Sequence, residues 1–360
     1  MSVDLLSPGR VHAGGHAHMA EASLRALLQR AVPELATGLW SLEQAQPLLT
    51  VMRRSQRFTS CSVTWTDHVQ GVMKNAQLVI KQDRRCEFYW ADRAARLLHQ
   101  GFGVGARSQV AAPFGVCAPG VLVCERVPEI SLLATLLAAE TPSDAGSAAE
   151  QAATWVLDLQ ALDLALPASN GRGLDACAPQ LVEVAAVAGQ AHSRELSRLA
   201  QLLHLAAHDD PAGAVQLVAS HGDLHPANLF VAPEAVTAID LDTVAAREPA
   251  YDVGYAVAHL VITPWLAGGP IQHALTASGR YWDTYRLGAG PATDRRVAVQ
   301  AARALVQSLH FELVTYRTNR LDLVGPYTAG ALALLDHGRA GLQVLADLAQ
   351  DVSLLPAAAV

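Results

Sequence analysis

The stretch from Ser220 to Asp242 limits what this chain can fold into more than any other part of the sequence. It places Asp223, Asn228 and Asp240 in that order, with five residues from the first to the second. A protein that supports phosphoryl transfer needs oxygen atoms that hold an acceptor hydroxyl in line and bind Mg²⁺ on the phosphate oxygens. The spacing therefore predicts a phosphoryl-transfer site, and the fold has to bring the three side chains together.

Two short β-prone runs follow Asn228, at residues 229–231 and 236–239, and Pro233 lies between them as a turn residue. This pattern predicts a hairpin with Asn228 at its start and Asp240 at its end. We therefore expect these two side chains to lie side by side.

Each of the three residues has a predicted role in this chemistry. Asp223 would orient the acceptor hydroxyl and take its proton, Asn228 would give a neutral oxygen to Mg²⁺, and Asp240 would give a carboxylate. A single Asp in a loop is commonly a turn former. The joint occurrence of all three in this order favours the functional interpretation.

Three neighbouring side chains have weaker predicted roles. His221 is a candidate catalytic residue, although a His beside such a loop more often braces it by hydrogen bonds. His225 is expected to support the loop in a similar way. Asp242 would either reach a second metal ion or stay solvated or bonded to the backbone.

The motifs at residues 221–228 (HGDLHPAN) and 239–242 (IDLD) resemble the signature of the aminoglycoside phosphotransferase and choline kinase-like family. The resemblance implies an α+β, two-lobed protein-kinase-like fold, with an antiparallel sheet plus a helix in the small N-lobe and a larger, mostly helical C-lobe. It also implies ATP or GTP as co-substrate, bound between the lobes with two Mg²⁺.

The segment at residues 248–254 (EPAYDVG) extends this resemblance. In the family, an Asp at the position of Asp252 starts a buried helix and anchors the catalytic loop. From the residues alone, Asp252 is equally an N-cap of a helix that begins at Val253. The two roles are compatible.

Upstream of these motifs, the run at residues 77–81 is apolar and β-branched and ends in Lys81, as the resemblance implies for the lysine that meets the α- and β-phosphates. A helical pattern follows from Tyr89 to His99. The carboxylate expected to pair with Lys81 is Glu87, with Asp92 as the alternative.

The run at residues 121–128 resembles the last N-lobe strand and the hinge that receives adenine, here through Glu125 and Val127. An ordinary strand that ends at Pro128 fits the same residues. Residues 60–65, with Ser62 at their centre, occupy the place of the nucleotide-covering loop but contain no Gly, which makes close backbone approach to phosphate harder.

Read from end to end, the chain falls into three expected parts. Residues 1–55 form a tail and a helical extension, with helices at 20–31 and 41–53. Residues 56–127 form the nucleotide-binding N-lobe, and residues 128–360 form the C-lobe with the catalytic loop and the acceptor-binding helices.

Composition supports a folded protein and excludes several partners. Of the residues, 51% are hydrophobic and 16% charged, and the net charge is −7, which gives no electrostatic support for a nucleic-acid partner. No run of the sequence is long and apolar enough for a bilayer, so no membrane partner is expected. The five cysteines lack ligand spacing and are expected to be free thiols in a reducing cytoplasm.

The acceptor remains open at this point, because the C-terminal helices offer both signs of charge. The acidic candidates Glu312, Asp322 and Asp336 would suit a cationic acceptor such as an aminoglycoside, and Arg317 and Arg320 would suit an anionic one. Each of the three carboxylates is equally explained as part of a solvated helix face.

The prediction is thus a Mg²⁺-dependent O-phosphotransferase that moves the γ-phosphate of ATP or GTP to an aminoglycoside-like or other polar small molecule, with antibiotic resistance as one role. A metabolic kinase for a sugar, amino alcohol or homoserine-like acceptor is the first alternative. A kinase-like nucleotide-binding or regulatory module without turnover is the second, because the Gly-rich loop is missing. A protein kinase is weaker, since residues 240–242 (DLD) lack the D-F-G form.

Overall fold

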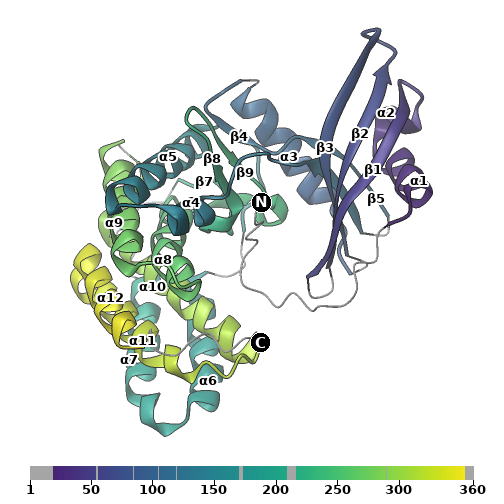
Figure 1. The fold of residues 1–360 in the computed structure, drawn as a ribbon. Helices are drawn as coiled ribbons and strands as arrows, with labels where there is room; N and C mark the ends of the chain where they lie inside the picture. The colour runs from purple at the N-terminus through teal and green to yellow at the C-terminus, as the bar shows by residue number, and fades with distance from the viewer. Residues whose placement is uncertain are drawn as a thin grey trace. The chain divides into compact units, whose positions relative to one another are not determined.

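The computed structural model describes residues 19–53, 56–83, 85–103, 105–118, 120–169, 173–208, 216–288 and 290–352 (Figure 1). The chain divides into two units. The first contains Met1–Glu129 and Thr237–Thr243, and the second contains Ile130–Val236 and Val244–Val360. The chain therefore crosses from the second unit to the first and back within a few residues of Asp240.

The first unit is built on a five-stranded antiparallel sheet. Its strand order is β1 (Trp40–Arg53), β2 (Gln56–Asp67), β3 (Val72–Gln82), β6 (Val121–Glu125) and β5 (Pro113–Cys117). Buried and half-buried residues alternate along β2, as expected when one face of a sheet is covered. The covered face carries Cys61, Val63 and Trp65.

Two helical segments flank this sheet. Helix α1 (Glu21–Ala31) buries Leu24, Leu27 and Leu28 in the same core, and the short α2 (Pro33–Ala36) follows it. Helix α3 (Tyr89–Phe102) packs against β4 (Ser108–Val110), β5 and the 3₁₀ turn η4 (Leu241–Thr243). Strand β9 (Val236–Ala238) leads into η4, and Ala111 donates a backbone hydrogen bond to the Ala238 carbonyl. These contacts fix the backbone around Asp240 within the first unit.

The helix expected over residues 41–53 is wrong, because this segment forms the long strand β1. Pro47 lies in its middle, and a proline in a helix interior removes a hydrogen bond and clashes with the preceding turn. In β1, which forms one edge of the sheet, Pro47 sits at a shift of register against β2. An edge strand tolerates proline at such a position.

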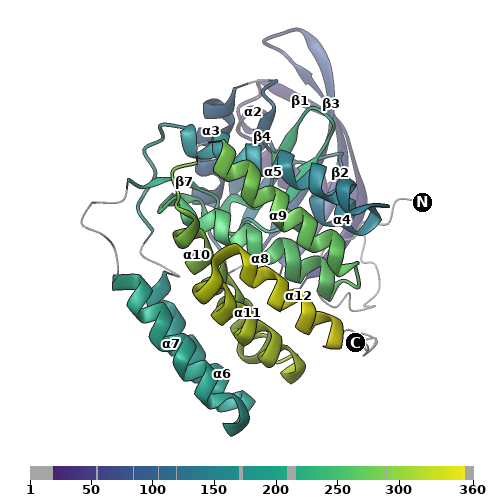
Figure 2. The ribbon, with the colours of Figure 1, turned by 90° about the vertical axis from the view of Figure 1, so that its left-hand side faces the viewer.

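The second unit is mostly helical and contains the remaining elements (Figure 2). Its α-helices are α4 (Leu132–Ala138), α5 (Pro142–Ala161), α6 (Cys177–Ala188), α7 (Ser193–His208), α8 (Ala250–Leu266), α9 (Ile271–Leu287), α10 (Asp294–His310), α11 (Val324–His337) and α12 (Gly341–Val352). Its short strands are β7 (Val218–Ser220), β8 (Leu229–Val231) and β10 (Ala245–Arg247). Its single turns are η1 (Leu174–Ala176), η2 (Gln190–His192), η3 (Pro226–Asn228), η5 (Phe311–Thr315), η6 (Leu321–Leu323) and η7 (Gly338–Ala340).

Helix α8 is the centre of this unit, because it is buried along most of its length and packs against both α9 and α10. Gly254 permits the close approach of α10: a Cβ at this position would lie 2.5 Å from the Cβ of Gln300. A central, buried helix is a suitable support for a functional loop. Figure 2 also shows α6 beside α7 and α11 beside α12.

The predicted α+β fold, with an antiparallel sheet in one part and a mostly helical second part, is confirmed. The predicted runs at 229–231 and 236–239 correspond to β8 and β9, and Ala232 donates to the Ala235 carbonyl across the turn between them. All five cysteines are free thiols, as expected. Among the helices that the structure describes, none combines the length and the apolar character needed to cross a bilayer.

Candidate active site

The loop from His221 to Asn228 connects β7 to β8 in the second unit. Strand β7 pairs with β10, so Ser220 lies opposite Ala245 at the start of the loop. Gly222 has a φ of +86°, in the left-handed region where a residue without a Cβ is favoured. The backbone therefore turns sharply just before Asp223.

The loop backbone is anchored by Asp252, whose side chain is almost fully buried in α8. One carboxylate oxygen accepts from the N–H of His221 at 2.6 Å, and the other accepts from the N–H of Gly222 at 2.8 Å. Such charge-assisted bonds are about twice as strong as neutral ones. Asp252 therefore has the anchoring contact that the family resemblance implies.

Asp252 is not an N-cap, so that expectation is wrong. Helix α8 begins at Ala250, and the residue before it, Pro249, already has helical angles. Proline is compatible with a helix start because its φ is fixed near the helical value and the first turn does not use its missing N–H. The helix therefore starts earlier than the apolar pattern suggests.

His221 braces the loop and is fully buried. Its Nδ1 accepts the backbone N–H of Asp223 at 3.3 Å, and the ring of Trp155 lies against it with centroids 6.2 Å apart. A ring enclosed in this way is suited to fixing the loop. The proposed role for His221 is therefore support and not proton transfer.

Asn228 fixes the backbone of Asp223 from the far end of the loop. Its Nδ2 donates to the Asp223 carbonyl at 3.0 Å, and Asn228 itself is buried in η3. Because the amide nitrogen is used in this contact, the side-chain Oδ1 is the atom left to bind a cation. This orientation suits the ligand role predicted for Asn228.

The carboxylate of Asp223 has two polar neighbours. Oδ1 accepts a hydrogen bond from the Oη of Tyr255 at 2.7 Å, and Oδ2 lies 3.9 Å from the Nε2 of His225. Burial by itself would raise the pKa of Asp223, but the charge of His225 and the Tyr255 hydrogen bond outweigh it and hold the pKa below its usual value. The carboxylate is therefore ionised at neutral pH, as a hydroxyl-orienting group must be.

His225 supports the loop from within. It caps η3, and its Nδ1 accepts the N–H of Ala227 at 3.3 Å. Its other ring nitrogen faces Asp223 at a distance longer than a hydrogen bond. The supporting role predicted for His225 remains the proposal.

In the first unit, Lys81 at the end of β3 contacts two carboxylates. Its Nζ lies 2.7 Å from Oδ1 of Asp240 and 2.6 Å from Oδ2 of Asp242. Burial alone would lower the pKa of Lys81, but the two aspartates outweigh it and hold the pKa above its usual value. Lys81 is therefore a fixed positive charge, and the ring of Phe88 lies 5.2 Å from it.

The expected partner of Lys81, Glu87, is exposed in the connection before α3, and the carboxylates that meet Lys81 are those of Asp240 and Asp242. The alternative, Asp92, forms an ion pair with Arg96 one turn along α3. Local sequence distance suggested Glu87, but the chain returns to β3 from far downstream. Only the tertiary structure shows that return.

Asp240 has a φ of +62°, which is uncommon for a residue with a side chain. Sparsely populated backbone conformations of this kind cluster at functional sites, where surrounding contacts over-determine them. Here Ala238, two residues before, is tied to Ala111, and η4 follows directly. The strained backbone aims the Asp240 carboxylate at Lys81.

The remaining nucleotide-site candidates lie in strands. Ser62 lies inside β2, paired with Gln46 and Gln77, so the covering loop expected at residues 60–65 is wrong. The chain passes from β1 to β2 at residues 54–55, which lie outside the described residues. Glu125 ends β6, and its N–H donates to the Ala112 carbonyl at 2.8 Å.

Val127 follows β6 by two residues, in the position expected for the hinge. Arg126, between it and Glu125, is tied back to Gln77 by its backbone N–H at 2.8 Å. The hinge backbone is thus fixed just before Val127. Adenine recognition at Glu125 and Val127 remains a proposal.

The three acceptor candidates lie in different settings. Glu312 lies in the π-helical turn η5, and Asp322 accepts a bidentate contact from Arg320 at 3.0 and 2.7 Å. Asp336 pairs with Arg198 of α7 at 3.1 Å. Asp322 and Asp336 therefore each have an internal cation, which reduces their capacity to bind a charged acceptor.

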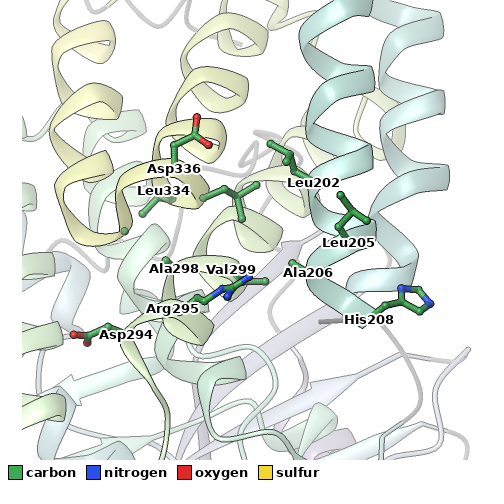
Figure 3. A pocket seen from close by; sticks show the side chains of 12 residues that line it. Leu202, Leu205, Ala206, His208, Asp294, Arg295, Ala298, Val299, Leu334 and Asp336 are labelled. Carbon is green, nitrogen blue, oxygen red and sulfur yellow. The ribbon is translucent and has the colours of Figure 1, made fainter. Parts of the chain in front are cut away.

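Asp336 also lines a cavity of about 770 Å³ between α7, α10 and α11 (Figure 3). Leucine and alanine side chains form half of its lining, and Asp294, Arg295 and His208 are among the other residues. No residue of the loop from His221 to Asn228 lines this cavity. Asp336 therefore lines a cavity that does not include the loop and is paired with Arg198, so its predicted acceptor role loses support.

Tyr255 donates a hydrogen bond to the Asp223 carboxylate, a contact that the sequence did not reveal. It reads as one more apolar residue of α8, and its hydroxyl contact to Asp223 depends on the loop folding back onto this helix. The available signal was its position three residues after Asp252, on the same side of a helix.

A sequence model described as the phosphotransferase enzyme family matches residues 81–312, which include Lys81, the catalytic loop and α8. No curated protein matches the sequence.

Solved structures with the same fold are similar over most of their length. One is an aminoglycoside phosphotransferase, APH(4)-Ia, in complex with ADP and hygromycin B (TM-score 0.54, 13% identity, 86% of this chain and 95% of that one). Another is a glucosamine kinase in complex with glucosamine, ADP and inorganic phosphate (TM-score 0.55, 15% identity, 88% of this chain and 85% of that one). A third is a choline/ethanolamine kinase family protein from Mesorhizobium loti (TM-score 0.54, 16% identity, 91% of this chain and 100% of that one).

Proposed function

The chain belongs to the phosphotransferase enzyme family and is an enzyme that phosphorylates hydroxyl groups, and we propose on this premise that its acceptor is a polar small molecule and its donor ATP or GTP. The observation that carries the proposal is the setting of Asp223. Its carboxylate is ionised, its backbone is held by Asn228, and the turn before it is anchored by Asp252. A fixed, charged carboxylate at this motif position is what a hydroxyl-orienting residue requires.

The role proposed for Asp223 is a proton transfer. The acceptor hydroxyl donates to the carboxylate, its oxygen forms a bond to the γ-phosphorus, and the proton passes to Asp223. The bond between the γ-phosphorus and the bridging oxygen breaks, and the nucleoside diphosphate leaves with that electron pair. The protein contributes position and charge, because phosphoryl transfer needs little covalent assistance.

The side chains around Lys81 fit a divalent cation. Oxygens of Asp240 and Asp242 already converge on one positive charge, the Lys81 Nζ, at 2.7 and 2.6 Å. Carboxylate oxygens are the ligands that Mg²⁺ prefers. When bound, Mg²⁺ would neutralise charge on the phosphate oxygens. We propose that Asp240 and Asn228 hold it, and that Lys81 turns from the carboxylates to the α- and β-phosphates.

The nucleotide base is proposed to bind at the end of β6, through backbone groups of Glu125 and Val127. The backbone here is already fixed, because the N–H groups of Glu125 and Arg126 donate to the carbonyls of Ala112 and Gln77. Side-chain identity matters little for such contacts, so ATP and GTP are both retained.

Two of the solved structures of similar fold hold hygromycin B or glucosamine, and a third is a choline/ethanolamine kinase family protein. The net charge of −7 is compatible with a cationic acceptor. We therefore propose an amino sugar, aminoglycoside or amino alcohol, with either a resistance or a metabolic role. The five free cysteines favour a reducing, cytoplasmic setting.

The test is a panel of acceptors with Mg-ATP and Mg-GTP, comprising hygromycin B, glucosamine and choline, with ADP or GDP release as the readout. Asp223→Asn should retain nucleotide binding and lose transfer by a factor of about 10³ or more, because charge changes while shape does not. Undiminished turnover in this variant would refute the assignment of Asp223.

A second candidate function is a nucleotide-binding module without turnover. It is motivated by Lys81, whose ammonium contacts two carboxylates, and by Ser62, which lies inside a strand where the nucleotide-covering loop was expected. Purified protein that binds Mg-nucleotide and releases no diphosphate with any acceptor of the panel would favour this candidate.

A further inference from the structure

Helix α8 contacts the catalytic loop along a single stripe. Asp252 accepts backbone N–H groups from His221 and Gly222, and Tyr255, three residues later, donates to the Asp223 carboxylate at 2.7 Å. Residues three apart in a helix lie on the same side. One helix therefore fixes both the backbone of the loop and its reactive side chain.

The ring of Tyr255 is itself held in place. Only 4% of the residue is exposed, and its ring lies against that of His259, one turn further along α8, with centroids 4.2 Å apart and planes tilted by 30°. His259 lies within hydrogen-bond distance of Thr263 at 3.0 Å and of Ser308 on α10 at 3.2 Å. These contacts leave the Tyr255 hydroxyl aimed in one direction.

On its other side, Tyr255 faces a buried cation. The guanidinium of Arg303 on α10 lies 5.7 Å from the centre of the Tyr255 ring and 4.1 Å from that of Tyr251. Gly254 brings α10 close to α8 beside this cluster. The support of Tyr255 thus extends through two packed helices.

The phenol acts as a donor in this arrangement. Burial and the neighbouring Asp223 carboxylate raise the pKa of Tyr255 well above its usual range, so the hydroxyl keeps its proton. The carboxylate oxygen that accepts it, Oδ1, is thereby engaged. The other oxygen, Oδ2, lies 3.9 Å from His225, which is longer than a hydrogen bond.

We propose that Tyr255 is a positioning residue that gives the two oxygens of Asp223 different tasks. Oδ1 is held by the Tyr255 hydroxyl, and Oδ2 takes the proton of the acceptor hydroxyl. A carboxylate otherwise rotates between two nearly equivalent settings about its terminal bond, and the hydrogen bond selects one of them. This inference depends on the proposed function, because it assigns a geometry to the same proton transfer.

The test is Tyr255→Phe, which removes one hydroxyl and keeps the ring on His259. A hydrogen bond to a charged group contributes enough for a fall in kcat of about 10- to 100-fold when it is lost. The KM values for Mg-ATP and for the acceptor should stay within about twofold, since Tyr255 is buried and its hydroxyl is bonded to Asp223. The acceptor is the panel member that the wild type phosphorylates fastest.

The matched control is Tyr285→Phe. Tyr285 is a buried tyrosine of α9 in the same unit, and its hydroxyl donates to the side chain of Gln160 at the same distance, 2.7 Å. Both variants lose the hydrogen bond of a buried tyrosine hydroxyl, but Tyr285→Phe should keep the wild-type kcat. Equal losses of kcat in the two variants would overturn the inference, because the effect would then follow from packing.

A second measurement does not use turnover. Denaturant unfolding is measured for Tyr255→Phe, for Asp223→Ala and for the double variant. Changes in the free energy of unfolding that are not additive report the direct bond between the two side chains. Additive changes together with an unaltered kcat in Tyr255→Phe overturn the inference alone, since the wild type remains active. A wild type that phosphorylates nothing in the panel overturns the proposed function, and this inference with it.

Discussion

The Nζ of Lys81 lies 2.7 Å from Oδ1 of Asp240, although 159 residues separate the two in the chain. Asp242 completes the arrangement at 2.6 Å, so one buried ammonium bridges two carboxylates. The contact links β3 to the turn that follows β9 and fixes the strained backbone of Asp240. If Lys81 binds the phosphates as proposed, it has to exchange these partners when the nucleotide binds.

Lys81→Met is expected to weaken Mg-ATP binding by about 10-fold or more, because a charge-assisted contact to the phosphates is lost. It should also lower the free energy of unfolding by about 1–2 kcal/mol, since two carboxylates lose their shared cation while water still reaches them. Titration calorimetry and denaturant unfolding measure the two effects.

The control for Lys81→Met is Lys74→Met on the same strand. Lys74 pairs with Asp67 at 3.0 Å and its side chain is 35% exposed, compared with 8% for Lys81. Its loss should leave Mg-ATP affinity unchanged. An unaltered affinity in Lys81→Met would contradict the nucleotide role of Lys81.

Asp252→Asn should destabilise the protein by about 2–4 kcal/mol, because one of the two oxygens that accept backbone N–H groups becomes an NH₂ group facing a donor. The loop before Asp223 should loosen, and turnover should fall together with stability. Urea unfolding and ADP release measure the two losses.

Asp294→Asn is the matched control for Asp252→Asn. Asp294 also lies in the first turn of a helix, but its carboxylate accepts from a side chain, the indole N–H of Trp282 at 2.8 Å. An asparagine can keep that bond through its carbonyl oxygen, so a loss of only about 1 kcal/mol or less is expected. Equal losses at the two sites would argue against the two-donor anchor.

His259 predicts a pH dependence of stability. Burial, followed by the charge of His225, lowers the pKa of His259 from about 6.5 to about 3 in the folded protein. His259 is therefore protonated below about pH 6.5 in the unfolded chain but only below about pH 3 in the folded protein. The contribution of His259 to the free energy of unfolding is fully present above pH 6.5. It is lost as the pH falls, by about 2 kcal/mol between pH 7 and pH 5.

The measurement is denaturant unfolding at pH 7 and pH 5 for the wild type and for His259→Asn. The variant should lose less stability than the wild type between the two pH values. His204→Asn, at an exposed position of α7, is the control and should keep the wild-type dependence. An unchanged pH dependence in His259→Asn would show that His259 is protonated without cost in the fold.

Much of the catalytic loop was accessible from sequence because its function depends on local spacing. The positions of Asp223 and Asn228, five residues apart, are close enough in the chain for the backbone itself to bring them into contact, and the Asn228 side chain does reach the Asp223 carbonyl. The strands after them were also predictable from short β-branched runs. Local chemistry carried both predictions.

Partners that come from distant segments were not accessible in the same way. Glu87 was expected beside Lys81 because it is near in the chain, but Asp240 and Asp242 occupy that place. The helix expected at residues 41–53 failed for a related reason. The apolar residues of this segment fit the period of a helix as well as that of a strand. Pairing with β2, together with Pro47, favours the strand.

The sequence alone determined which residues could perform the chemistry, since the order and spacing of aspartate, asparagine and lysine identify an enzyme family without any coordinates. The tertiary structure alone decided how each is held: which carboxylates meet Lys81, which oxygen of Asp223 is bonded, and that Tyr255 bonds it. The reason is physical. Spacing along a chain fixes contacts only within a few residues, whereas contacts between distant segments depend on how the buried surfaces pack.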